Sequence, residues 1–259
     1  GMLFHRELTV AQYVCYHCDH HLRIDVEERL TNLFDDGDYQ RHAVPKVPTD
    51  PLKFKDKKKY ADRLNDAQKK RNRKDAIVVA TGKIKGHGAM IAAFDFKFMG
   101  GSMGAGVGEG IVVAAEKAVK KGLPLIVIPS SGGARMQEAA FSLMQMPRTT
   151  IAVEMVKEAG LPYIVLLTDP TTGGVSASFA MLGDIQIAEP GAMIGFAGKR
   201  VIQETIREEL PDNFQTAEYL LEHGMVDMVC ARKDQPEMLS RIIDMLMNKK
   251  TNGKGGKKS

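Results

Sequence analysis

Two glycine pairs occur at matching places in this 259-residue sequence, where backbone N–H groups could bind an oxygen anion. Gly132-Gly133 and Gly173-Gly174 each follow an apolar run and a short polar loop, and each unit begins with Gly-Leu-Pro, at 122–124 and at 160–162. Glycines between a strand and a helix let the backbone approach a ligand and turn N–H groups toward it. A single pair is equally typical of a tight turn without a ligand. The duplication favours binding, and we expect the two loops to converge on one anion.

No titratable side chain near these loops has the pattern of a general base or a nucleophile. Asp169 precedes a proline, which is typical of a turn, and Ser176 and Ser178 fit the start of a helix better than a nucleophile. The sequence has no His-Glu-x-x-His motif. If the chain is an enzyme, its chemistry is therefore expected to depend on backbone electrostatics.

Hydrophobic patterns predict the elements that must position these loops. We expect strands at 76–81 and 89–96 around a turn at 86–88, a helix at 111–121 and a buried strand at 125–128. The stretch 98–110 contains six glycines, but no Gly-Lys-Ser/Thr follows them. It is therefore not a P-loop, and its spacing does not fit a dinucleotide-binding fingerprint.

The composition is that of a globular protein, with 44% hydrophobic and 26% charged residues and a formal net charge of +4. No apolar run reaches the ~18–20 residues of a membrane span, and the N-terminal stretch lacks the apolar region of a signal peptide. We expect no membrane association.

A local basic segment, 46–74, carries 12 Lys and Arg against 4 Asp. It predicts a solvated helical connector, or alternatively a docking surface for phosphates or an acidic partner. Only Phe54 and Tyr60 are aromatic in it, so stacking on single-stranded nucleic acid is poorly supported.

Cys15 and Cys18 have the Cys-x-x-Cys spacing that can present two thiolates to a zinc ion. A closed structural site needs four ligands, and nearby histidines in so short a run do not complete it, so a reduced thiol pair is the stronger interpretation. With Cys230, predicted to lie in a late strand and in the core, the chain has three cysteines, which fit a reducing compartment.

Six stretches carry a resemblance to a known family: FMGGSMG at 98–104, SGGARMQE at 131–138, SLMQM at 142–146, and the runs 167–184, 188–198 and 200–208. They resemble the beta subunit of the bacterial-type acetyl-CoA carboxylase carboxyltransferase, from about Leu3 to Met247. The resemblance implies an α/β fold of the crotonase-like (ClpP/crotonase) class, a spiral of ββα units. It also implies transfer of a carboxyl group from carboxybiotin to acetyl-CoA, which gives malonyl-CoA for fatty acid biosynthesis.

The resemblance also implies residue roles. After decarboxylation, the biotin nitrogen takes the acetyl proton, and the protein stabilises the enolate oxygen. Oxyanion or thioester-positioning backbone is expected at Gly132, Gly133, Ala134, Gly173 and Gly174. Cofactor binding is expected at Gly100, Gly101, Ser102, Met103 and Arg135. Which loop faces biotin and which the thioester stays open.

The family resembled here works with partners: an alpha subunit, a biotin carboxyl carrier protein and biotin carboxylase. We expect a hetero-oligomer of two alpha and two beta chains, in the bacterial cytoplasm or, in a eukaryote, the plastid stroma. The apolar content of 135–146 and 175–182 suits helices buried against another subunit, although an ordinary core has similar content. The methionines from Met136 to Met155 are predicted to fill a helical core.

One departure concerns metal. The family has a four-Cys zinc ribbon, whose second pair matches Cys15 and Cys18, and counting back places the first pair ahead of Gly1. We expect a ribbon remnant, so that zinc is possible here only at an incomplete site. The predicted organisation is a partial ribbon-like segment (1–36), a basic helical connector (37–74), a carboxyltransferase domain (75–248) and a flexible Lys/Gly tail (249–259).

Three other functions remain open from the sequence. The chain could be a carboxyltransferase or decarboxylase half for another acyl-CoA. A crotonase-type hydratase acting alone would need a carboxylate pair over the acyl chain, which neither loop provides. A nucleic-acid-binding module would use segment 46–74 and the Cys pair, and its binding would fall steeply with salt.

Overall fold

The computed structural model describes residues 3–247, without the side chains of Arg200 and Ile206. The predicted tail at 249–259 and residue 248 lie outside the described residues. Seven strands form one sheet, in the order β1 (Tyr39–His42), β2 (Ile77–Ile84), β3 (His87–Phe94), β4 (Leu125–Ile128), β5 (Tyr163–Leu167), β7 (Ile185–Ala188) and β9 (Met228–Val229). The first three strands pair antiparallel, and from β3 to β9 every pair is parallel.

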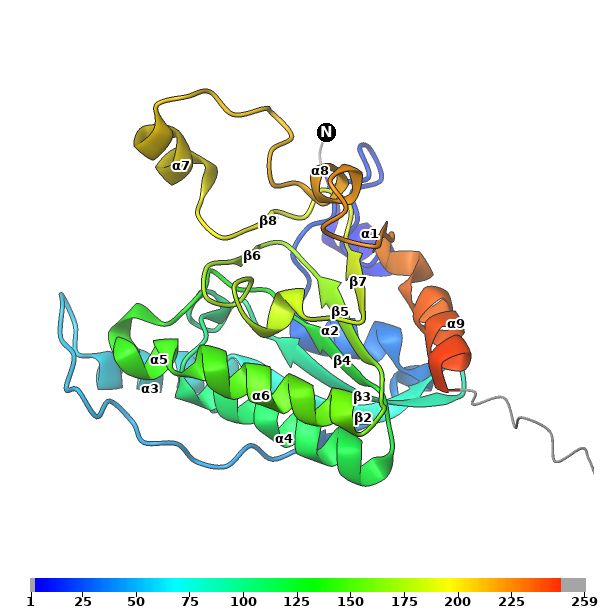
Figure 1. Cartoon of the computed structure of the whole chain (residues 1–259), viewed down its shortest axis with the longest axis horizontal. Coiled ribbons are helices and arrows are strands. Elements are labelled where there is room, and N and C mark those ends of the chain that lie inside the picture. Colours follow the sequence, from blue (N-terminus) through cyan, green and yellow to red (C-terminus); the bar gives the residue numbers. More distant parts are fainter. Residues whose placement is uncertain (1–2, 248–259) are drawn as a thin grey trace, which may run out of the picture.

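Helices cover both faces of this sheet (Figure 1). On one face pack α4 (Ala105–Lys121) and α6 (Gln145–Glu158), and on the other pack α2 (Val26–Leu33) and α9 (Gln235–Met247). Alternate residues of the central strands enter the two cores: Val127 faces α4, whereas Ile126 and Ile128 belong to the core beneath α9. Burial on both faces explains why these strands are uninterrupted apolar runs.

The remaining helices are shorter. They are α1 (His5–Val10), α3 (Tyr60–Arg71), α5 (Ala140–Leu143), α7 (Lys199–Ile206) and α8 (Ala217–Glu222), with 3-10 turns at Asp35–Gly37, Met99–Gly101, Met136–Glu138, Phe179–Met181 and Arg232–Asp234. None of the helices between residues 3 and 247 is long and apolar enough to cross a membrane.

A second, small sheet joins the successive strand-loop units, which repeat along the chain. Strands β6 (Thr171–Thr172) and β8 (Ile194–Gly195) pair in parallel, and a bridge between Ser131 and Thr171 adds the end of the β4 unit to them. Each unit therefore runs from a long strand of the main sheet to a short strand of the small sheet and on to a helix or turn. This arrangement agrees with the predicted α/β spiral of ββα units.

Several sequence predictions need correction at their boundaries. The turn between β2 and β3 is Lys85-Gly86 rather than 86–88, because β3 already begins at His87. Helix α4 begins at Ala105 rather than residue 111 and includes three of the glycines. A Cβ on Gly110 would lie 2.6 Å from Ile77, and Gly106 and Gly108 are equally tight against neighbouring side chains. Close packing therefore outweighs the low helix propensity of glycine.

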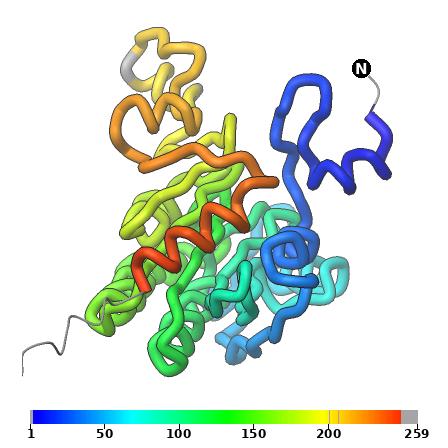
Figure 2. The backbone as a smooth tube through the Cα atoms, turned by 90° about the vertical axis from the view of Figure 1, so that its right-hand side faces the viewer, coloured from blue at the N-terminus to red at the C-terminus, as the bar shows by residue number. Residues whose placement is uncertain are grey.

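The N-terminal segment contacts the residues between β9 and α9, late in the sequence (Figure 2). The Arg232 guanidinium donates to the carbonyl oxygens of Gln12 (2.6 Å) and Leu22 (3.0 Å) and pairs with Glu189 (2.7 Å). Arg29 of α2 also forms an ion pair with Glu189, at 2.8 Å. The side chains of Arg29, Arg232 and Glu189 are all buried. Cys230 is buried, which confirms its predicted place in the core, but it follows the last strand, β9, instead of lying within it.

Candidate active site

The two Gly-Gly loops meet, as their duplication predicted. Strands β4 and β5 are parallel neighbours, so their following loops leave the sheet at the same edge. The Ser131 N–H donates to the Pro170 carbonyl oxygen (2.6 Å), and the Thr172 N–H donates to that of Ser131 (3.1 Å). Beyond this bridge the backbones of Gly133 and Gly173 are in contact.

The N–H groups of the five predicted oxyanion residues differ in availability. Three of them are used inside the protein: Gly132 donates to the Gly100 carbonyl (3.0 Å), Gly133 to the Ser131 Oγ (3.0 Å) and Gly173 to the Phe196 carbonyl (3.0 Å). Within residues 3–247, the N–H groups of Ala134 and Gly174 donate to no protein acceptor. One unpaired donor therefore remains on each loop.

The stretch 100–103, predicted to bind cofactor, lies against the first loop. The Met103 N–H donates to the Gly133 carbonyl (2.8 Å), and the Arg135 N–H donates to that of Met103 (2.9 Å). Gly101 has a φ of +64°, and a Cβ there would overlap the Ser130 carbonyl oxygen. Met103 thus forms an isolated parallel bridge with Ala134, which holds the first loop in place. The structure brings four of the predicted cofactor residues, Gly100, Gly101, Ser102 and Met103, to this loop.

The fifth, Arg135, lies in the interior with no exposed side-chain surface. Its guanidinium donates to the Ser102 carbonyl (2.8 Å), to the Ser102 Oγ (3.1 Å) and to Asp75 (3.0 Å). Burial opposes the charge, but the nearby Asp75 carboxylate outweighs it and keeps the pKa of Arg135 above its usual value. Direct contact of Arg135 with a cofactor stays a prediction, and its present position lets it act on the loop through Ser102.

Tyr60 and Glu138 extend this network, which sequence reasoning missed. The Tyr60 hydroxyl donates to Glu138 Oε1 (2.5 Å), and the other oxygen of Glu138 accepts the first N–H of α4, from Ala105 (2.7 Å). Arg135 also donates to both Tyr60 and Glu138. Burial raises the pKa of Tyr60, which keeps its hydroxyl protonated as a donor. Helix α3 is thereby joined to the loop that carries Ala134.

Asp169 has the turn role that the sequence indicated. Its Oδ1 accepts the Met193 N–H (3.3 Å), and its Oδ2 forms an ion pair with Arg23 (3.1 Å). The Arg23 guanidinium also lies 4.1 Å from the centre of the Phe96 ring. The carboxylate therefore joins the second loop to the residue that precedes β8 and to the N-terminal segment.

The two cysteines do not make a closed metal site. Cys15 is buried and Cys18 is exposed, and the described residues contain no group of three His, Cys, Asp or Glu side chains that could hold a metal ion. A hydrogen bond from the His17 backbone lowers the pKa of Cys15. Two thiols do not fit the four-ligand site of a structural zinc.

The prediction of a helical core is wrong for two of the four methionines from Met136 to Met155, whereas Met146 does pack against the core. Met136 and Met144 are 67% and 59% exposed, together with the neighbouring side chains Phe141 and Leu143. Met136 lies on the turn at Met136–Glu138, Phe141 and Leu143 lie on the four-residue helix α5, and Met144 lies between α5 and α6. On α7, Val201 is also exposed, and in Figure 1 this helix stands away from the main sheet.

Comparison with known proteins shows which family the chain resembles in sequence. The family model described as "Carboxyl transferase domain" matches residues 49–255. The acetyl-coenzyme A carboxylase carboxyl transferase subunit beta of Granulibacter bethesdensis is 64% identical over 95% of this chain and 80% of its own length. The corresponding protein of Sinorhizobium medicae is 56% identical over 96% of this chain and 82% of its length.

Two solved structures share the fold. A transcarboxylase 12S structure has a TM-score of 0.68 and 26% identity, over 86% of this chain and 41% of that one. A Pseudomonas malonate decarboxylase hetero-dimer has a TM-score of 0.62 and 22% identity, over 86% of both chains.

The fold and the paired loops define a crotonase-like α/β carboxyl transferase domain. Within that class, the chain belongs to the family of acetyl-coenzyme A carboxylase carboxyl transferase beta subunits, and it is a transferase subunit that acts in carboxyl transfer to acetyl-CoA.

Proposed function

We propose that Ala134 and Gly174 supply the backbone donors that stabilise the enolate oxygen of acetyl-CoA during carboxyl transfer. The supporting observation is one unpaired N–H on each of two loops whose glycines are in contact. Preorganised donors at ~2.7–3.1 Å from a developing oxyanion contribute about 3–4 kcal/mol each. Gly132, Gly133 and Gly173 shape the loops, since their own N–H groups are already used.

Carboxybiotin on a carrier protein supplies the carboxyl group and, once this is released, the base that takes the acetyl proton. The surroundings of Gly174 suit such a substrate, because Met103 and Met146 lie beside it: a Cβ on Gly174 would be 3.5 Å and 3.3 Å from their side chains. In apolar surroundings two N–H dipoles act more strongly on a developing negative charge than they do in water. The stretch 100–103 shapes the cofactor side of the site, with Arg135 holding Ser102.

A second subunit completes the site in this proposal. The exposed apolar side chains Met136, Phe141, Leu143 and Met144 form a surface beside the first loop. We propose that an alpha subunit covers this surface in a complex of two alpha and two beta chains. The biotin carboxyl carrier protein and biotin carboxylase are the further partners, and the bacterial cytoplasm is the proposed location.

The proposed organisation keeps the carboxyltransferase domain at 75–248, after a ribbon-like segment at 1–36. Residues 37–74 remain the proposed connector, although they contribute β1 to the edge of the main sheet and α3 to its helical face.

Reconstitution tests the split site. The purified chain is mixed with acetyl-CoA and carboxybiotin, with and without an alpha subunit, and malonyl-CoA is measured. We expect turnover only with the alpha subunit, because in this proposal the paired loops of the chain form only one part of the site and the alpha subunit forms the other. Full turnover by the chain alone, as a monomer in light scattering, would refute the proposal.

A further inference from the structure

Arg23, in the segment that precedes α2, forms an ion pair with Asp169, just before the second glycine loop. The Arg23 Nε lies 3.1 Å from Asp169 Oδ2, and the guanidinium carbon lies 4.1 Å from the centre of the Phe96 ring. The matched carboxyl transferase domain begins at residue 49, so Arg23 lies outside it. The N-terminal segment therefore brings a cation to one of the paired loops from outside that domain.

Short backbone contacts connect Asp169 to the unpaired N–H of Gly174. The Asp169 Oδ1 accepts the Met193 N–H (3.3 Å), and the Met193 carbonyl oxygen accepts the Thr171 N–H (2.9 Å). Thr171 begins β6, which pairs with β8 and ends two residues before Gly174. A shift of the Asp169 side chain is therefore transmitted along β6 to the Gly174 N–H.

The backbone on both sides of Arg23 is held in place. On one side, the Arg232 guanidinium donates to the Leu22 carbonyl oxygen (3.0 Å). On the other side, the Asp25 carboxylate forms an ion pair with Arg71 (2.7 Å). Because its backbone is already fixed, Arg23 has to order only its own side chain when it binds Asp169.

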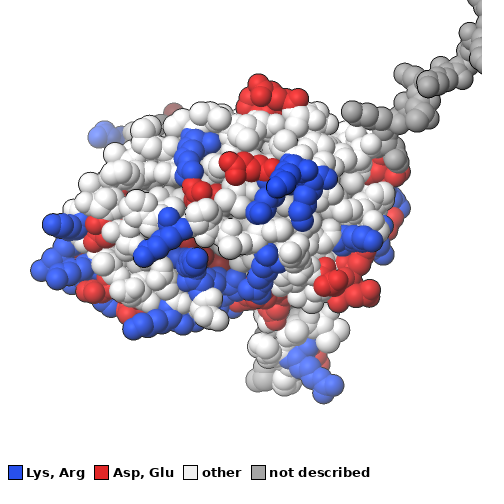
Figure 3. All heavy atoms as spheres, turned by 90° about the horizontal axis from the view of Figure 1, so that it is seen from below, with Lys and Arg blue, Asp and Glu red and all other residues white. Residues whose placement is uncertain are grey.

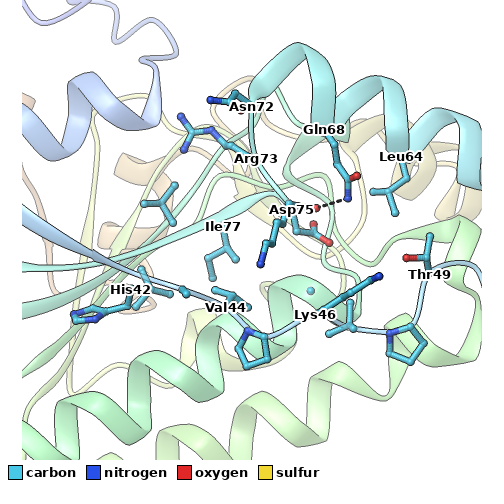
Figure 4. Close-up of a pocket in the computed structure, with 18 of the residues that line it drawn as sticks. His42, Val44, Lys46, Thr49, Leu64, Gln68, Asn72, Arg73, Asp75 and Ile77 are labelled. Atoms are coloured by element: carbon cyan, nitrogen blue, oxygen red, sulfur yellow. Dashed lines mark hydrogen bonds between the residues drawn. The ribbon is translucent and has the colours of Figure 1, made fainter.

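Two other features of the surface involve different residues. Lys and Arg side chains gather on the face shown in Figure 3. A cavity of about 510 Å³ opens between segment 41–49, α3 and β2 (Figure 4). Arg23, Phe96 and Asp169 do not line this cavity. A substitution at Arg23 therefore leaves the lining of the cavity intact.

We infer that Arg23 is a positioning residue for carboxyl transfer: through Asp169 it holds the second loop so that the Gly174 N–H stays directed at the enolate oxygen. This role rests on the oxyanion function proposed for Gly174. The enolate forms only during the reaction, so an interaction that positions its donor acts on kcat and not on the KM for acetyl-CoA.

Steady-state kinetics of the complex reconstituted with an alpha subunit test this role. Arg23→Met removes the charge but keeps an apolar side chain of similar length against Phe96. An exposed ion pair shifts an equilibrium by up to about fivefold, so kcat should fall about three- to fivefold while KM stays within about twofold. Arg23→Lys should keep kcat close to that of the unmodified chain, because an ammonium group can still pair with Asp169.

Arg241→Met is the matched control. The Arg241 Nε also forms an exposed ion pair of 3.1 Å, with Glu237, but this pair lies on α9. Its loss should leave kcat unchanged. An equal fall of kcat in Arg241→Met and Arg23→Met, or a rise in KM at unchanged kcat in Arg23→Met, would overturn the inference.

Hydrogen exchange, followed by mass spectrometry on the same complexes, gives a readout that does not depend on turnover. Backbone amides of residues 171–174 should exchange about three- to fivefold faster in Arg23→Met and at an unchanged rate in Arg241→Met. Unchanged exchange in Arg23→Met would refute the role of Arg23. The two proposals fail separately: full turnover in Gly174→Val refutes the oxyanion function, whereas loss of turnover there with unaltered exchange and kcat in Arg23→Met refutes only the role of Arg23.

Discussion

Gly133 and Gly173 approach so closely that a Cβ on either would lie 3.3 or 3.2 Å from the Cα of the other. Their φ angles are +110° and +62°, in the region that side chains disfavour. The two loops therefore depend on glycine at both positions for their contact.

We expect Gly173→Ala to lower the free energy of unfolding by about 1–2 kcal/mol, because a residue with a side chain is strained at this φ. Turnover should fall at least tenfold, since the added methyl group pushes the loops apart. Gly132→Ala is the matched control, because its Cβ would meet only the Gly100 carbonyl oxygen, at 3.8 Å. Urea unfolding and steady-state assays measure both effects, and equal behaviour of the two variants would contradict the contact's role.

Replacing Gly174 by valine should reduce kcat by about 10²-fold or more, as removal of an oxyanion donor does. The new side chain would meet Ala134 and Met146 and would displace the Gly174 N–H. Asp169→Asn should cost less than tenfold, because the amide oxygen can still accept the Met193 N–H. If Asp169→Asn abolished turnover while Gly174→Val kept it, the backbone mechanism would be wrong.

Tyr60→Phe should destabilise the protein by about 1–3 kcal/mol, because Glu138 loses a buried hydrogen-bond donor. Turnover should fall as well, since Arg135 and its loop lose a shared neighbour. Tyr39→Phe provides the comparison: its hydroxyl binds Glu27 in a more exposed position, so its effect should be smaller. Thermal unfolding of both variants measures these losses of stability. A larger loss of stability in Tyr39→Phe than in Tyr60→Phe would contradict the role of the network.

Stability should fall in acid because of Glu189. Burial alone would raise the pKa of Glu189, but Arg29 and Arg232 outweigh it and hold this pKa well below its usual range. A depressed pKa stabilises the folded state above the unfolded value of about 4.3, and this contribution is lost as pH falls below it. Glu189→Gln should be less stable at pH 7 and should lose less stability between pH 5 and 3. Urea titrations across this range measure the slope, and parallel slopes would contradict the assignment.

The exposed apolar surface should decide assembly. Phe141→Glu and Met144→Glu should abolish the complex with an alpha subunit in light scattering while the isolated chain stays folded, because a charge would be buried at the interface. Met245→Glu is the control, since Met245 is 71% exposed on α9, on the other face of the main sheet. An intact complex in the Phe141 and Met144 variants would place the partner elsewhere.

The convergence of the Gly-Gly loops could be predicted because it follows from local repeats: two parallel strands of similar pattern end at one edge. The sequence could not predict which N–H groups stay unpaired. The N–H groups of Gly132 and Gly173 donate to the carbonyl oxygens of Gly100 and Phe196, which lie in other parts of the chain. The early start of α4 was missed because glycine disfavours an isolated helix, and only its packing partners explain it.

The hydrogen-bond network around Arg135 could not be predicted either, because its members come from distant parts of the sequence. Tyr60 and Asp75 lie 75 and 60 residues before Arg135 in the sequence, so no spacing connects them. A carboxylate such as Glu138, three residues after an arginine, reads as an ordinary exposed pair, whereas here it binds the start of α4.

The attachment of Arg232 to Gln12 and Leu22 spans 220 and 210 positions of sequence. During translation, the segment around Gln12 leaves the ribosome long before Arg232 is made. The carbonyl groups of Gln12 and Leu22 therefore stay bound to water until β9 has joined the sheet and Arg232 can donate to them. Because closing so long a loop is slow, the N-terminal segment should be the last part of the chain to resist a protease in pulse-labelled nascent protein.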